Sequence, residues 1–175
     1  MTPNKPSLSI FSDLRNVIVE RLRSSSDFAG PPSIEIVSTD QSDFGDRIEK
    51  ALALRIGSGS AAGIAVVVGN VGFEPGGDLW DVQATIGITI AENVVLNTGP
   101  HGSGKRSEDL QAVIYALLMF SDDSTQAWIP SDSWSQLSFQ DSVLQEAGQT
   151  NIYAMTFKSS AMVVATQFPK PQPII

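Results

Sequence analysis

The chain has 175 residues, 42% of them apolar, which fits one globular domain with a real core, and no apolar run reaches the roughly 18 residues of a membrane span. It contains no cysteine and a single histidine, His101, which excludes disulfides, thiolate metal sites, cysteine nucleophiles and any site that needs two imidazoles. The net charge is −8, and residues 56–157 carry only Lys105 and Arg106 against eleven acidic residues, a balance that disfavours binding of nucleic acid through its phosphates.

The first part of the chain predicts a helix followed by a short strand. Residues 1–6 lack the apolar core of a signal peptide, so we expect a soluble protein made in the cytosol. Apolar residues recur at three- and four-residue steps over Ser7–Ser24, which predicts an amphipathic helix capped by Ser7. Ser24–Pro32 is rich in turn-forming residues and predicts a connector, and Ser33–Ser38 alternates briefly as a strand.

The middle of the chain predicts a second helix and a long β-hairpin. Asp43–Arg55 has helical spacing, Gly63–Val71 is apolar on both faces like a central strand, and Gly72–Asp78 reads as a loop. Leu79–Asn93 then predicts a long antiparallel strand with one covered face, because apolar residues occupy every second position: Trp80, Val82, Ala84, Ile86, Ile88 and Ile90. At about 3.3 Å per residue its alternating part spans roughly 35 Å, more than a typical strand, so the hairpin can outrun its own domain.

The next elements are a loop, a helix and an irregular stretch. After the loop Val94–Arg106, Ser107 is expected to cap a helix with acidic residues in its first turn. Ser121–Ser124 ends this helix, and Trp128 and Ile129 predict a short edge segment that Pro130 closes. The buried stripe of the helix is expected to contain Leu110, Val113, Ile114, Leu117 and Leu118.

The last part predicts a second hairpin and an extended arm. A turn near Ala147–Thr150 separates two runs with apolar residues of one parity: Leu137 and Phe139, then Tyr153, Met155 and Phe157. Residues 168–175 contain three prolines and are expected to be extended, which leaves residues 1–167 as a single domain. The fold class expected is α+β: a mostly antiparallel twisted sheet with a long hairpin, flanked on one face by two or three helices.

One motif suggests nucleotide binding. Gly99–Lys105 matches the first seven positions of a phosphate-binding loop of the form G-x-x-x-x-G-K-[ST], in which backbone amides and the lysine surround the phosphates. The eighth position is Arg106, so the magnesium ligand is missing, and Pro100 removes one amide. A glycine-rich loop without a ligand is the preferred interpretation. His101 in this loop has no sequence-placed partner for acid–base catalysis and is read as a solvated histidine.

Acidic residues and tryptophans give the remaining candidates. Acids that could bind calcium or magnesium lack the spacing of a calcium loop, so a solvated acidic surface is preferred for Asp122, Asp123, Glu74, Asp78 and Asp81. Three further acids are too scattered to form a carboxylate pair: Asp132, Asp141 and Glu146. Trp80, Trp128 and Trp134 could form a stacking platform, but Trp80 has the buried parity of its strand and is read as core. We therefore expect no catalytic, cofactor or metal site and no enzymatic activity.

Assembly is the function that the pattern itself suggests. A long hairpin that outruns the core, an open face of β-competent residues and terminal arms suit a subunit that adds strands to its neighbours in a ring or tube. A monomer with a solvated sheet is the alternative, and the sequence weighs the two about equally.

The order of elements resembles the tail terminator (tail completion) proteins of tailed bacteriophages. The matching stretches are Leu14–Leu22, Gly63–Asn93, Asp109–Leu118 and Asn151–Lys158. The resemblance implies a virion structural protein that forms a homo-hexameric ring on the tail tube, ends tube polymerisation and contacts head-tail connector or neck proteins. DNA would only pass through its lumen, which an acidic lining would suit.

The chain departs from this family by the helix expected at Asp43–Arg55 and by its proline-rich tail. Another neck, head-tail joining or tail-tube subunit is therefore the alternative. A nucleotide-binding enzyme, based on Gly99–Lys105, is a remote one.

Overall fold

A computed structural model describes residues 10–29, 34–38, 62–76, 79–97, 106–146 and 150–164. The predicted helix at 43–55, the glycine-rich loop at 99–105 and the arm at 168–175 lie outside these ranges. The described elements are, in chain order, α1 (Ile10–Arg23), α2 (Ser26–Ala29), β1 (Glu35–Ser38), β2 (Ala62–Gly76), β3 (Leu79–Asn93), α4 (Val94–Asn97), α5 (Ser107–Met119), β4 (Ser138–Glu146) and β5 (Thr150–Val164). No described helix is long and apolar enough to cross a membrane.

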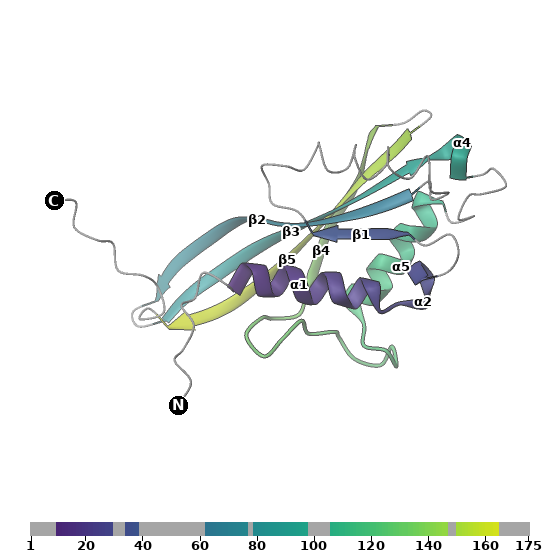
Figure 1. The fold of residues 1–175 in the computed structure, drawn as a ribbon. Coiled ribbons are helices and arrows are strands. Elements are labelled where there is room, and N and C mark those ends of the chain that lie inside the picture. The colour runs from purple at the N-terminus through teal and green to yellow at the C-terminus, as the bar shows by residue number, and fades with distance from the viewer. Residues whose placement is uncertain are drawn as a thin grey trace.

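The strands form one sheet in the order β1-β2-β3-β5-β4, in which β1 and β2 are parallel and every other pair is antiparallel. Helix α1 packs against β1 and β2, and α5 packs against β3, β4, β5 and α1 (Figure 1). These contacts confirm the expected α+β class, and the register of β2 with β3 confirms the long hairpin.

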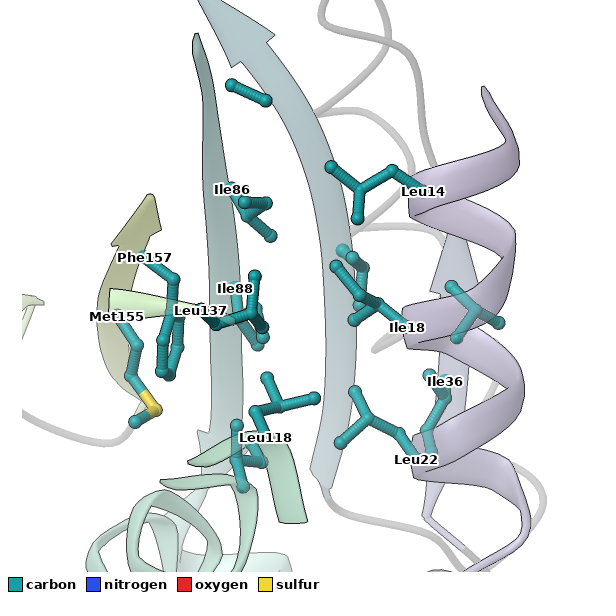
Figure 2. Packing of buried hydrophobic residues seen from close by; sticks show 14 of the residues in the cluster. Leu14, Ile18, Leu22, Ile36, Ile86, Ile88, Leu118, Leu137, Met155 and Phe157 are labelled. Carbon is teal, nitrogen blue, oxygen red and sulfur yellow. The ribbon is translucent and has the colours of Figure 1, made fainter. Parts of the chain in front are cut away.

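The core lies between the helices and one face of the sheet. Leu14, Ile18 and Leu22 follow one another at four-residue steps along α1 and point toward the strands (Figure 2). They belong to the same buried cluster as Ile86 and Ile88 of β3, and all five side chains are buried. Burying a side chain of this size contributes roughly 1.5–3 kcal/mol, so this cluster contributes substantially to the stability of the fold.

Three strands are longer than a typical strand. β2, β3 and β5 each have 15 residues, about 50 Å at 3.3 Å per residue. Figure 1 shows them continuing past the N-terminal end of α1. The loop expected over Gly72–Asp78 is therefore wrong for its first five residues, which pair with β3 as far as Gly76 opposite Leu79. A register shift between Gly69 and Val71 lets the pairing continue.

Three other local predictions are wrong. The loop expected over Val94–Arg106 begins with the short helix α4. The connector expected over Ser24–Pro32 contains the short helix α2, because the Ser25 hydroxyl accepts the backbone N–H of Asp27 and the Phe28 side chain is buried. Trp128 and Ile129 form no strand. Here the chain is held by an isolated bridge between Phe120 and Ala127 and by the Trp128 N–H donating to the Met119 carbonyl.

The N-terminus of α5 also differs from expectation by one residue. Arg106 is the N-cap, and its backbone N–H donates to the Asp109 carboxylate at 3.3 Å. Ser107 is the first helical residue and is fully buried. The expected buried stripe holds for Leu110, Ile114 and Leu118, whereas Val113 and Leu117 are half-buried.

Candidate interface at the outer end of the sheet

The face of the sheet opposite α1 and α5 changes character along β3. Its odd-numbered residues are buried near the end of the strand, at Thr89 and Ala91, whereas Gln83 is exposed. We call residues 72–76, 79–83 and 160–164 the outer end, since they are paired with one another through β3. The described helices lie on the opposite face, and among the described residues of this face the outer end is the more exposed part.

An apolar patch lies on the open face of the outer end. Leu79 is directly opposite Val164, and Met162 is opposite Asp81, one step along on the same face. Leu79, Met162 and Val164 are all exposed, Met162 to 63%. These three side chains form a small apolar patch next to the carboxylate-bearing Asp81.

Two carboxylates flank this patch. Glu74 of β2 is directly opposite Asp81 of β3, and Glu74 is exposed. Like charges directly opposite one another on a sheet are unfavourable, and a cation supplied by a neighbouring chain would relieve this repulsion. No group of three potential metal-ligating side chains occurs among the described residues, so these acids do not form a metal cluster there.

A buried carboxylate sits at the other end of β3. Glu92 is 0% exposed and continues the even parity of the isoleucines. Its carboxylate accepts the Asn97 amide at 2.8 Å and the Ser107 backbone N–H at 2.9 Å, and it lies 3.0 Å from the Arg106 Nε. Glu92 thus holds the first turn of α5 in place, where the positive end of the helix favours an anion.

The pKa of Glu92 is lowered below its ordinary value of 4.5. Burial by itself raises this pKa, but the hydrogen bonds from Asn97 and Ser107 and the charge of Arg106 together outweigh burial. Glu92 is therefore an ionised structural anchor. Sequence reasoning missed it, although its place at the next even position after Ile90 was a signal for burial.

The remaining sequence candidates are separated by the fold. Gly99–Lys105, His101 and Asp78 lie outside the described residues, but Arg106, at the position where a phosphate-binding loop has serine or threonine, is engaged by Glu92. Asp122 pairs with Arg21, and the Asp123 carboxylate accepts the Thr125 N–H at 3.1 Å. Two other acids are exposed, Asp132 in a loop and Asp141 on β4. The structure does not describe the side chain of Glu146.

The three tryptophans take separate packing roles. Trp134 is buried, with its ring 5.9 Å from that of Phe11. The Arg21 guanidinium lies over the Trp128 ring, and its Cζ is 5.5 Å from the centre of that ring. Trp80 packs at the edge of the core, as its parity predicts. Each ring is thus used within the fold, and the geometry gives the stacking platform no support.

A scan against protein-family models finds no match to this chain, and a search of curated proteins finds no significantly similar sequence.

Proposed function

We propose that this protein is a virion structural subunit of the tail terminator type. Copies would form a closed ring, with hexamer as the expected state, at the head-proximal end of a bacteriophage tail tube. The ring would stop tube growth and join the tube to neck or connector proteins. The protein would be made in the host cytoplasm, reside in the tail or neck of the virion, and act without catalysis.

The observation that carries this proposal is the outer end of the sheet. Leu79, Met162 and Val164 are exposed there, on strands that continue past α1. Leu79, Met162 and Val164 are 42%, 63% and 43% exposed, so covering them recovers about half of the roughly 1.5–3 kcal/mol that full burial of each side chain gives, which is a modest contribution to a contact between copies. The acidic balance of residues 56–157 adds support, because a lumen that conducts DNA must repel its phosphates.

Native mass spectrometry and negative-stain imaging of the purified protein at micromolar concentration, alone and with isolated tail tubes, test the proposal. We expect one closed ring that binds the end of a tube. A persistent monomer that ignores tubes would contradict it.

The same images separate the alternative of a tail-tube or head-tail joining subunit. A tube subunit makes a contact that does not close and grows into open filaments, whereas a terminator stops at one ring. Filaments of uniform diameter would therefore replace the terminator assignment with a tube assignment, while leaving the shared outer end in place.

A further inference from the structure

At the outer end, the sheet has two edges that no described strand covers. β1 pairs with β2 only from Gly63 to Val66, so past Val66 the described residues pair with β2 only on the side of β3. On the other side of the sheet, the pairing of β5 with β4 stops at Lys158. The outer parts of β2 and β5 are therefore the two edges of a three-stranded ribbon, which continues past α1 (Figure 1).

The backbone of Ser160 shows which residues of β5 face its edge. The Ser160 N–H donates to the Ser135 hydroxyl at 3.0 Å, and the Ser160 carbonyl accepts the Ser135 N–H at 2.8 Å, so both groups point away from β3. In an antiparallel strand the N–H and C=O of one residue point to the same side, and successive residues alternate. The register of β5 with β3 is uninterrupted, so the backbone groups of Met162 and Val164 also point to this edge, where no described residue pairs with them.

The same alternation identifies the edge residues of β2. Asp81 of β3 turns its N–H and C=O away from β5 and toward Glu74 of β2. The residues of β2 that alternate with Glu74 face the open edge, namely Val71, Phe73 and Pro75. Proline has no N–H, and a register shift lies just before Val71. Val71 and Phe73 are therefore the two residues of this edge that offer both a donor and an acceptor.

We propose that β5 of one copy adds to the β2 edge of the next copy, so that the sheet continues from copy to copy. Each edge offers two residues with both backbone groups, and an extended strand is the partner that satisfies such an edge. β2 and β5 are both antiparallel to β3 and hence parallel to one another, so the added strand is parallel when successive copies point the same way. A contact between two different edges is heterologous and can close into a ring. This inference rests on the ring proposed above.

The open backbone groups also set the register between copies. In a parallel pair, the N–H and C=O of one residue bond to the two residues that flank the residue opposite it. Met162 reaches both open residues of the β2 edge when it lies opposite Gly72. Val164, two residues later, then lies opposite Glu74. Both of these side chains are exposed and lie on the same face of the sheet.

Engineered disulfides test this pairing, because the chain has no cysteine of its own. Glu74→Cys with Val164→Cys places two thiols opposite one another across the contact between copies. Within one copy, β3 separates these strands by two strand spacings, about 10 Å, whereas a disulfide joins Cα atoms no more than about 7 Å apart. Gly72→Cys with Met162→Cys is a second pair in the same register. Glu74→Cys with Val143→Cys is the matched control, since Val143 is also exposed but lies on the other edge strand, β4.

After mild oxidation, denaturing electrophoresis without reductant should show each double variant of β2 and β5 at successive multiples of the chain mass, ending at the ring. The control and each single-cysteine variant should stay at the mass of one chain. The pairing is overturned if the wild type assembles in sedimentation velocity but neither double variant cross-links, or if the control cross-links equally. It is also overturned if Val164→Cys alone forms covalent dimers, because β5 would then pair with β5. A monomeric wild type would refute the ring and this pairing together.

Discussion

The two ends of β3 place one alternating strand in opposite environments. At the end near α5, Thr89 and Ala91 on the face away from the helices are buried, and Glu92 on the covered face is buried in a polar network. At the outer end, Leu79 of that same face is exposed, and so is Met162, which is paired with Asp81. The alternation of apolar and polar residues therefore predicts which face of a strand packs against the helices. It does not predict how far along the strand the other face is buried.

This difference matters because a sheet end with exposed apolar residues is costly to leave in water. Within the described residues, α1 and α5 cover the strands only on one face, and the strands continue past the N-terminal end of α1 (Figure 1). The end under the helices stabilises the fold of one copy. We assign the outer end to contacts between copies.

The largest expected effect on the stability of one copy is at the covered end. Ile88→Ala removes a fully buried side chain and should lower the free energy of unfolding by about 2–5 kcal/mol. Met162→Ala, at a position 63% exposed, should change it by less than about 0.5 kcal/mol. Urea unfolding of each variant at a concentration low enough to prevent assembly makes this comparison, and similar losses for the two would contradict it.

The next effect concerns the polar network at the covered end. Glu92→Gln keeps the shape of the side chain but removes the charge and one of the acceptors used by Asn97 and Ser107. We expect a loss of about 1–3 kcal/mol in the free energy of unfolding, because a buried donor loses its partner. Chemical denaturation at neutral pH is the measurement, with exposed Glu20→Gln of α1 as a matched control that should cost far less.

The pH dependence of this loss follows from the lowered pKa of Glu92. The stability that ionised Glu92 contributes is fully present above pH 4.5, the ordinary pKa of glutamate. It is lost as the pH falls through the lower pKa that Glu92 has in the folded protein. The difference in stability between the wild-type chain and Glu92→Gln should therefore be constant near neutrality and shrink below about pH 4.5. A difference that grows on acidification would show that the folded pKa is raised.

The smallest effect is expected at the exposed ion pair. Asp122 is 87% exposed where it meets Arg21, in contrast to the fully buried Glu92. Asp122→Asn should cost about 0–1 kcal/mol, and less at high salt, because water and ions screen exposed pairs. Thermal melts at low and high salt measure it; a salt-independent loss larger than that of Glu92→Gln would contradict this ranking.

The sequence predicted the parts of the fold that depend on local pattern. The alternation from Trp80 to Ile90 predicted which face of β3 is covered, and the spacing of apolar residues predicted the helices α1 and α5. Prediction from the sequence failed where the structure of a segment depends on a residue or strand that is distant in the chain. Gly72–Gly76 has turn composition but pairs as strand because β3 continues beside it, and Arg106 rather than Ser107 is the N-cap where Glu92 of the preceding strand holds the helix start.

The length of β3 was predicted from the sequence, but the apolar patch at its outer end was not. A strand too long for its domain suggested that copies of the chain share it. The apolar patch, however, depends on the register that places Leu79 opposite Val164. Such a register cannot be predicted from one strand, because the two residues are far apart in the chain, at positions 79 and 164.

Sedimentation velocity of three chains at micromolar concentration tests most directly whether the outer end is shared between copies. The chains are the wild type, Met162→Asp and Val95→Asp; Val95 is 64% exposed, almost the same as Met162 at 63%, but follows the opposite end of β3. We predict that the wild type and Val95→Asp form one closed oligomer and that Met162→Asp remains monomeric. A monomeric wild type, or a Met162→Asp variant that assembles like the wild type, would contradict the account.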